Sequence, residues 1–297
     1  MPTATSSSTS TSMRAFRVAY DGTPYYGFQR QPDVPTVEDA IFDALRALEV
    51  FADDHRPAGY AAAGRTDAGV SALAQTVAVE APDWLTPRAL NSQLPETVRA
   101  WAHADAPEDF HATHHADSRT YTYHLHAPPD TVDDERFDAA LTALSGPHDF
   151  HNLTPDDDHT ERAPTLEAVR ESGNENRDAD REGEVERESD YLLVTVRAGG
   201  FCRELVRRLV SLAHAIGTGD ASLEKIDRVL APAPLPGHEG VPPAPPEPLV
   251  LADVAYPDLA FERDAEAAAS AREIFDRRRT EQRTAARISR QLRDGVG

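Results

Sequence analysis

The stretch AGRTDAGVSA, residues 63–72, lies between two apolar segments whose pattern is typical of β-strands. Gly64 and Gly69 permit tight turns and a close approach of a ligand to the backbone. An aspartate presented by such a loop, here Asp67, can serve as a nucleophile, a base or a metal ligand. A structural turn in which Asp67 bonds its own backbone is an equally weighted alternative, because Asx turns of this composition are common. The loop residues alone therefore leave the role of Asp67 open.

The chain around this loop alternates strand and helix patterns. Apolar residues at every second position from Phe16 to Tyr20 predict a half-buried strand, and order is expected from about Arg14. Thr36, with Asp39 at the reciprocal position, predicts the start of a helix. Further elements of this half are expected as extended segments near 57–63 and 75–79, a short helix near 86–93 and a strand near 97–104.

The second half of the chain repeats this pattern. Tyr121 and Tyr123 share one face of a predicted strand, and the stretch from Phe201 to Ile216 predicts an amphipathic helix. Ser222 is expected to cap a shorter helix. The remaining elements are expected as a helix near 137–144, strands near 165–171, 191–198 and 249–256, a mobile charged insertion at 171–190 and a Pro-rich loop at 231–248. Two similar halves of alternating strands and helices predict an α/β or α+β protein.

The composition is strongly acidic, with 51 Asp and Glu against 30 Lys and Arg and a formal net charge of -21. Lys225 is the only lysine, so nearly all of the basic residues are arginines. We interpret this surface as an adaptation to multimolar salt, because net charge concerns solubility and association and does not exclude an RNA partner. Cys202 is the only cysteine, which excludes an intramolecular disulfide and a cysteine-based zinc cluster. Without a signal peptide or a membrane-spanning apolar run, a cytoplasmic location is expected.

The chain beyond Phe261 has a helix-like pattern that is dense in arginine. Two interpretations are open for this tail: a solvated surface helix, which is slightly favoured, and a segment that contacts RNA. The arginines of the tail are Arg277, Arg278, Arg279, Arg283, Arg287, Arg290 and Arg293.

The heptapeptide GRTDAGV at residues 64–70 resembles the active-site signature of the TruA family of tRNA pseudouridine synthases. Other stretches resemble segments of the same family, and they occur in the same order over roughly residues 14–259, which chance matches to a short pattern would not give. These stretches are YDGTPYYGFQRQ at 20–31, TVEDA at 36–40, residues 91–95, DFHA at 109–112, RTYTY at 119–123, HDF at 148–150, residues 201–210 and LVLADVAYP at 249–257.

This resemblance implies a role for each matching site residue. Asp67 would be the essential carboxylate, which attacks the target uridine at the base or at the ribose anomeric carbon. Arg65 would occupy the space left by the flipped nucleotide or contact its phosphate, and Tyr121 would stack on the uracil. Arg207 would pair with Asp67 and hold it ionised.

The resemblance also implies an architecture and a partner. The expected fold has two ferredoxin-like, RRM-like halves with a joined antiparallel sheet, flanking helices and a catalytic cleft between the halves. The expected units are a disordered tail at 1–13, a half carrying the Asp loop at 14–105, a half carrying the Tyr strand and the Arg helix at 106–260, and a charged helical tail at 261–297. The implied activity is the isomerisation of uridines on the 3′ side of the tRNA anticodon stem-loop by a homodimer, without a metal or a cofactor.

Two residues depart from the family pattern. Thr113 stands where an arginine is usual after Phe-His-Ala, and Pro248 replaces a usual glycine. They put the positioning of the substrate in question, but not the reaction.

Other features of the sequence permit further interpretations. Three histidines, His111, His114 and His115, could be metal ligands, but ordinary histidines at a strand end fit their spacing better. Residues 67–69 also resemble the catalytic loop of aspartic proteases, in which two aspartates share a proton. The chain has one copy of this loop, so a dimer would be required, and the nearby Arg65 would oppose proton sharing. Cys202 fits a buried helix thiol better than a reactive one. A protein that binds RNA without catalysing a reaction is the alternative from another functional class. Such a protein would be expected to lack Asp67, which is present here.

Overall fold

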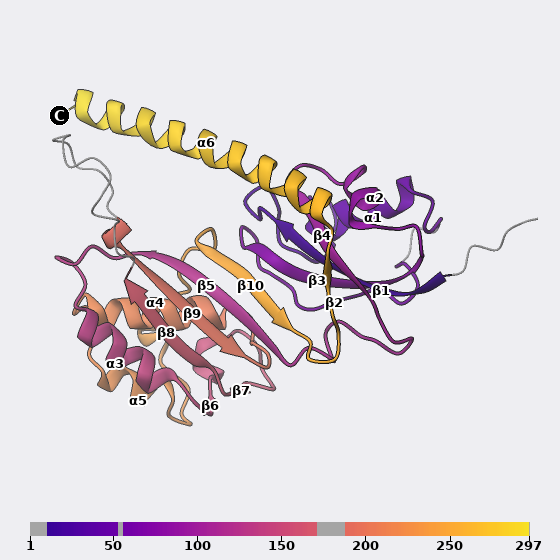
Figure 1. The fold of residues 1–297 in the computed structure, drawn as a ribbon. Coiled ribbons are helices and arrows are strands. Elements are labelled where there is room, and N and C mark those ends of the chain that lie inside the picture. Colours follow the sequence, from indigo (N-terminus) through magenta and orange to yellow (C-terminus); the bar gives the residue numbers. More distant parts are fainter. Residues whose placement is uncertain (1–10, 53–55, 171–187, 297) are drawn as a thin grey trace, which may run out of the picture.

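The computed structural model describes residues 11–52, 56–170 and 188–296, and its strands form one long, mostly antiparallel sheet (Figure 1). The order of strands across this sheet is β11-β4-β1-β3-β10-β5-β9-β8, with β2 paired to β3 off the main path. A separate pair is formed by β6 and β7. The mixed α+β class and the large sheet with flanking helices agree with the predicted pseudouridine synthase fold.

The first half of the sheet is built on β1, which pairs antiparallel with β3 on one side and with β4 on the other. Thr36 accepts a hydrogen bond from the backbone N–H of Asp39, which confirms the predicted helix cap. The elements of this half are β1 (Thr11–Tyr20), α1 (Val37–Ala47), β2 (Ala61–Ala62), β3 (Ser71–Pro82), α2 (Pro87–Asn91) and β4 (Val98–Asp105).

The second half is built on β5 and β9, whose register pairs Tyr121 with Val196 and Tyr123 with Val194. Helices α3 and α4 pack together and, with α5, enclose the apolar core of this half. Its elements are β5 (Ser118–His126), α3 (Asp134–Leu144), β6 (His148–Asp149), β7 (Glu161–Arg162), β8 (Thr165–Arg170), β9 (Tyr191–Ala198), α4 (Leu205–Gly217), α5 (Glu224–Val229) and β10 (Leu249–Ala255), with short 3-10 turns at His151–Leu153, Glu188–Asp190 and Gly237–Glu239.

The two halves join where β10 inserts between β3 and β5. On one side β10 pairs antiparallel with β5, and Leu251 lies opposite Tyr121. On its other side β10 pairs in parallel with β3, and the same Leu251 lies opposite Ala72. The joint is therefore parallel, although an antiparallel sheet was expected throughout. It places the strand that follows the Asp67 loop one strand away from the strand that carries Tyr121.

Local differences from the predicted elements have physical causes. The strand β1 begins at Thr11, earlier than the predicted Arg14, because its first residues pair with β3. The helix α4 begins at Leu205 and not at Phe201, because Glu204 adopts a left-handed conformation with φ +62°. Ser222 bonds the Glu224 side chain but does not cap α5. Residues 1–10 of the predicted tail and 171–187 of the predicted insertion lie outside the described residues.

The tail beyond Phe261 forms a two-residue strand, β11 (Glu262–Arg263), and then one long helix, α6 (Ala265–Val296). The first part of α6 packs on β4 and α2 through Ala267, Ala271 and Ile274. The remainder extends past the first half and ends away from it (Figure 1). The predicted helical pattern of the tail is confirmed.

Candidate functional site

Hydrogen bonds from β1 and β3 hold the loop between β2 and β3, which carries Asp67. Tyr20 and Thr66 share a buried hydroxyl–hydroxyl bond of 2.8 Å, and Gln75 donates to the Gly64 carbonyl at 2.9 Å. A main-chain bond of 3.1 Å from Val70 N–H to the Asp67 carbonyl closes the turn, and Gly69 follows with φ +81°. These contacts fix the backbone at Asp67, so its side chain is presented from a rigid base.

The turn after β1 packs directly on this loop and forms further hydrogen bonds with its backbone. Phe28 N–H donates to the Thr66 carbonyl at 3.0 Å, and Gly69 N–H donates to the Tyr25 carbonyl at 3.3 Å. A Cβ atom at Gly22 would meet the Val70 carbonyl oxygen at 2.1 Å. The stretch at residues 20–31 therefore supports the Asp67 loop, a role that the sequence analysis did not assign to it.

Asp67 and Arg207 meet across the joint between the halves. Arg207 Nη2 donates to Asp67 Oδ2 at 2.9 Å, with side chains 11% and 33% exposed respectively. The other terminal nitrogen of this guanidinium, Nη1, donates to the Ala244 carbonyl at 3.0 Å. Among the described residues, no backbone N–H donates to the Asp67 carboxylate. Asp67 therefore does not form the alternative Asx turn, and its carboxylate accepts from the Arg207 guanidinium instead.

Glu204 lies beside this pair and was not singled out from the sequence. Its Oε1 atom is 3.6 Å from Arg207 Nη2, and its Oε2 atom accepts from Arg208 Nη2 at 2.6 Å. The left-handed backbone at Glu204 is unusual for a residue with a side chain, and such conformations concentrate at functional sites. Arg207 is thus held by three partners, two of them acidic.

Tyr121 faces the same cavity from β5 and packs edge-on against Phe201, with ring centroids 5.3 Å apart. Burial, and secondly the nearby charge of Asp67, raise the pKa of Tyr121 to about 12. The Tyr121 hydroxyl is therefore neutral at any physiological pH, and the ring offers a flat apolar face next to the carboxylate.

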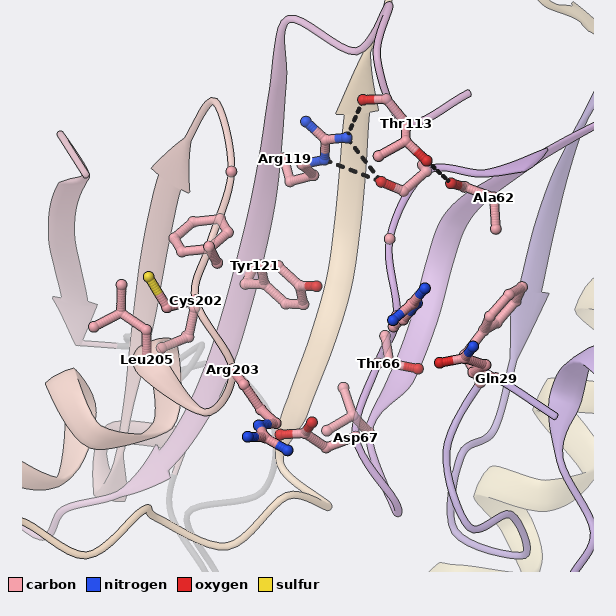
Figure 2. A pocket seen from close by; sticks show the side chains of 18 of the residues that line it. Gln29, Ala62, Thr66, Asp67, Thr113, Arg119, Tyr121, Cys202, Arg203 and Leu205 are labelled. Atoms are coloured by element: carbon pink, nitrogen blue, oxygen red, sulfur yellow. Dashed lines mark hydrogen bonds between the residues drawn. The ribbon is translucent and has the colours of Figure 1, made fainter. Parts of the chain in front are cut away.

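Arg119 ties three segments of the cavity wall together. Its guanidinium donates to the Ala63 carbonyl at 2.8 and 3.2 Å, to the Thr113 carbonyl at 2.6 Å and to the Gly199 carbonyl (Figure 2). Burial lowers the pKa of Arg119, since its partners are carbonyls and not carboxylates. The sequence marked Arg119 only as part of a family motif and gave no role to it.

Thr113, which departs from the family pattern, lies at the edge of the cavity. Its hydroxyl donates to the Ala62 carbonyl at 2.6 Å and so fastens the segment after β4 to β2. The other departure, Pro248, directly precedes β10 and its carbonyl accepts from His124 N–H at 3.1 Å. Neither residue contacts Asp67 or Arg207.

A cavity of about 920 Å³ surrounds these residues, and Arg65 lines it with an exposed side chain. Arg65 has no carboxylate partner among the described residues. The lining includes six arginines and four carboxylates, so the cavity is locally positive in a chain whose net charge is -21. The arginines are Arg56, Arg65, Arg119, Arg162, Arg203 and Arg207, and the carboxylates are Glu38, Asp67, Asp156 and Glu204. The structure thus brings Asp67, Arg65, Tyr121 and Arg207 together around one cavity.

The histidines of the predicted strand end lie at one side of this cavity. The rings of His111 and His114 are 4.2 Å apart, and His111 N–H donates to His115 Nδ1 at 2.8 Å. Burial, followed by repulsion from the neighbouring histidines and Arg56, lowers the pKa of His111. Within residues 11–52, 56–170 and 188–296, no three His, Cys, Asp or Glu side chains are grouped to hold a metal ion.

Cys202 is buried as predicted, and burial raises the pKa of its thiol, but it lies before the start of α4 and not in a helix. In the part of the chain that the structure describes, no helix has the length and apolar character needed to cross a membrane.

A family model and the similar curated proteins point to the same protein family. A family model described as tRNA pseudouridine synthase matches residues 140–257. The chain is 55% identical over 292 residues to tRNA pseudouridine synthase A of Haloarcula marismortui, covering 96% of this chain and 100% of that protein. It is 52% identical to the protein of that name from Natronomonas pharaonis, covering 93% and 97%, and 35% identical to the one from Methanosarcina mazei, covering 82% and 84%. With an identity this high over nearly its whole length, the chain belongs to the tRNA pseudouridine synthase A family.

Proposed function

We propose that this protein isomerises uridine to pseudouridine on the 3′ side of the tRNA anticodon stem-loop, with Asp67 as the nucleophile. The observation that carries the proposal is the Asp67 carboxylate, paired with Arg207 at 2.9 Å in a cavity lined by arginines. Membership of the tRNA pseudouridine synthase A family supplies the substrate class and the reaction type.

The reaction needs a carboxylate that is ionised and aimed at the nucleoside. Asp67 attacks either the ribose anomeric carbon or the base, the bond from that carbon to the uracil nitrogen breaks, and the uracil turns. A carbon–carbon bond then joins the base to the ribose anomeric carbon, and the bond to Asp67 breaks and restores the carboxylate. The proton on the joined base carbon is lost, and the freed nitrogen gains a proton. The product is an isomer of the substrate, so atoms and electrons balance without a co-reactant.

Arg207 pairs with the nucleophile and orients it. Two opposite charges in contact attract by about 4 kcal/mol at an effective dielectric near 20, and the partial exposure of Asp67 to the cavity reduces this value. The Ala244 carbonyl and Glu204 fix the position of the guanidinium, so the carboxylate that pairs with it is oriented. This orientation supplies part of the catalytic effect, because a positioned nucleophile needs little rearrangement at the moment of reaction.

The target uridine has to leave its base stack to reach Asp67. Base flipping costs a few kcal/mol, and stacking on an aromatic ring recovers about 1 to 3 kcal/mol. Tyr121 is placed to stack on the uracil, since its neutral ring faces the cavity next to Asp67. Arg65 is placed to fill the vacated space or to bind the phosphate, since its guanidinium is exposed and has no carboxylate partner among the described residues.

We further propose that the enzyme acts as a homodimer in the cytoplasm, without a metal or a cofactor, and that its functional units are residues 14–105 and 106–260. Residues 14–105 contain Asp67, and residues 106–260 contain Tyr121 and Arg207, so the reaction would require both units. The acidic surface suits a salt-rich cell, in keeping with the relatives from halophilic archaea.

The test is pseudouridine mapping in an unmodified tRNA transcript incubated in multimolar KCl. Wild type, Asp67→Asn and a matched control, Asp130→Asn, whose aspartate is exposed and outside the cavity, are compared. Modification on the 3′ side of the anticodon stem-loop by the wild type and the control, but not by Asp67→Asn, is expected. Modification by all three would show that Asp67 is not the catalytic group.

Two further outcomes separate the alternatives. Modification at another tRNA position would keep the reaction but overturn the proposed target. Binding of tRNA without modification by any of the three proteins would favour the RNA-binding module without catalysis.

A further inference from the structure

The distal part of α6, from Arg279 to Val296, stands apart from the rest of the protein. Every residue in this stretch is exposed, and at 1.5 Å per residue the stretch is about 25 Å long. Figure 1 shows it running past the end of the first half as a free helix. We call this stretch the α6 arm.

The charge of the α6 arm is opposite to that of the whole chain. The arm has five arginines and two acids, Glu281 and Asp294, while the formal net charge of the protein is -21. Three of its exposed arginines, Arg283, Arg287 and Arg290, have no ion pair or side-chain hydrogen bond with any described residue. The basic charge of this surface is therefore available to another molecule.

The arginines of the arm share one face of the helix. With 3.6 residues per turn, Arg279, Arg283, Arg287, Arg290 and Arg293 fall within about one third of the helix circumference. The side of α6 that faces the protein carries Ala267 and Ile274, and Ile288 and Leu292 continue this side along the arm. The arginine face thus lies to one side of the face that meets the protein, and Arg279 at its start still lines a hollow beside β1 and β3.

The arginines that precede the arm behave differently. Arg277 pairs with Glu96 at 2.6 Å, and Arg278 pairs with Asp21, so both neutralise acids of the first half. Within the arm, Arg279 and Arg293 pair with acids of α6 itself, Asp276 and Asp294, and none of the five arginines pairs with a described acid of the first half. Their charge therefore favours a partner outside this chain.

We propose that the arginine face of the α6 arm binds the phosphate backbone of tRNA at a distance from the catalytic cavity. Guanidinium groups bind phosphates through two parallel hydrogen bonds, which suits conditions in which salt weakens long-range attraction. An arm that projects from an acidic body also keeps the phosphates away from the carboxylates, because repulsion between exposed charges is screened within about 10 Å at 0.1 M salt and less at higher salt. This inference rests on the proposed function for the identity of the RNA.

The test is the triple variant Arg283→Gln, Arg287→Gln, Arg290→Gln in the full-length chain. Glutamine is a good helix former, so α6 is retained, and circular dichroism checks this. The dissociation constant for an unmodified tRNA transcript is expected to rise roughly tenfold, since one exposed ion pair is worth a factor of about two. The slope of log affinity against log KCl concentration is expected to become shallower by about 2 to 3. The loss of activity is expected in KM more than in kcat.

A second triple variant, Arg136→Gln, Arg228→Gln, Arg263→Gln, is the matched control. It makes the same change of net charge at exposed arginines outside the arm and the cavity, and it is expected to keep the wild-type affinity and salt slope. Unchanged tRNA binding by the arm variant, or an equal loss in both variants, would overturn the proposal. A lower oligomeric mass of the arm variant with unchanged tRNA affinity would also overturn it, in favour of a second copy as the partner. Because binding is measured without turnover, weaker binding by the arm variant would stand even if the wild type formed no pseudouridine.

Discussion

Arg207 donates a 2.9 Å hydrogen bond to Asp67 although the two residues are 140 positions apart in the sequence. The bond spans the joint between the two halves of the sheet, where β10 lies between β3 and β5. A change at either residue therefore tests both the charge of the site and the way the halves meet.

Arg207→Gln is expected to lower kcat/KM for tRNA by about 30-fold or more, because loss of one partner of a desolvated charge pair costs about 2 to 5 kcal/mol. Without the cation, the Asp67 and Glu204 carboxylates would face each other without a shared partner. The neighbouring Arg208→Gln is the control, because Arg208 pairs with Glu204 and not with Asp67. Single-turnover rates distinguish the two, and equal losses in both variants would contradict this role of the Arg207–Asp67 pair.

Tyr121→Phe is expected to keep most of the activity, whereas Tyr121→Ala should lose about 5-fold to 100-fold through lost base stacking worth about 1 to 3 kcal/mol. The ring and not the hydroxyl is expected to matter, because the pKa of Tyr121 is raised to about 12 and the hydroxyl stays neutral. Steady-state rates of pseudouridine formation by the wild type, Tyr121→Phe and Tyr121→Ala test this ranking of activity. A Phe variant as inactive as the Ala variant would show that the hydroxyl takes part in the reaction.

The same raised pKa predicts how stability depends on pH. The folded state holds the Tyr121 proton more tightly than the unfolded state, so this contribution is present below pH 10 and is lost as the pH rises towards 12. Between those values the wild type is expected to lose up to about 2 kcal/mol more unfolding free energy than Tyr121→Phe. Urea unfolding at a fixed KCl concentration measures the difference, and parallel curves for the two proteins would contradict it.

Gly22→Ala is expected to reduce the rate strongly while the overall fold is kept. The new Cβ atom would meet the Val70 carbonyl oxygen at 2.1 Å, and backbone cannot move aside without displacing the Asp67 loop. Gly237→Ala is the matched control, since a Cβ atom there would meet nothing within 4 Å. Wild-type single-turnover rates in Gly22→Ala would show that the turn after β1 does not position Asp67.

Arg119→Gln is expected to lower the unfolding free energy by about 1 to 3 kcal/mol, because the buried carbonyl of Ala63 and the part-buried bonds to Thr113 and Gly199 would lose their donor. Arg197→Gln, on the adjacent strand β9, removes an exposed arginine and is expected to cost less than about 1 kcal/mol. Chemical denaturation measures both. An equal loss of unfolding free energy in both variants would mean that the bonds from Arg119 to the carbonyls do not stabilise the fold more than an exposed arginine does.

Much of the fold could be predicted because its signals are local. The Thr36 cap and the strand from Phe16 to Tyr20 depend on neighbours in sequence, and the structure confirms both elements. The predicted half-burial of this strand is wrong, because β1 is buried on both faces from Met13 to Tyr20. The start of α4 could not be predicted from the apolar spacing after Phe201. The left-handed backbone at Glu204, whose carboxylate pairs with Arg207 and Arg208, keeps the helix from beginning before Leu205.

The candidate site was predictable only with the help of family resemblance. Composition and spacing left the role of Asp67 undecided, and they could not indicate that Arg207 would be its partner. The contribution of Arg119 depends on three segments that come together only in the folded chain, and the sequence has no pattern for such contacts. The same holds for Gly22, whose importance lies in what it packs against.

The late position of β10 in the sequence has a consequence for synthesis on the ribosome. Residues 249–255 complete the joint between β3 and β5, and a chain growing from its N-terminus makes these residues after Asp67, Tyr121 and Arg207. Because contacts between distant segments form slowly, the nascent chain is expected to fold parts of each half before the two halves are connected. A partly translated chain would therefore hold its nucleophile without a finished cavity, and its capacity to modify RNA would arise only near the end of translation.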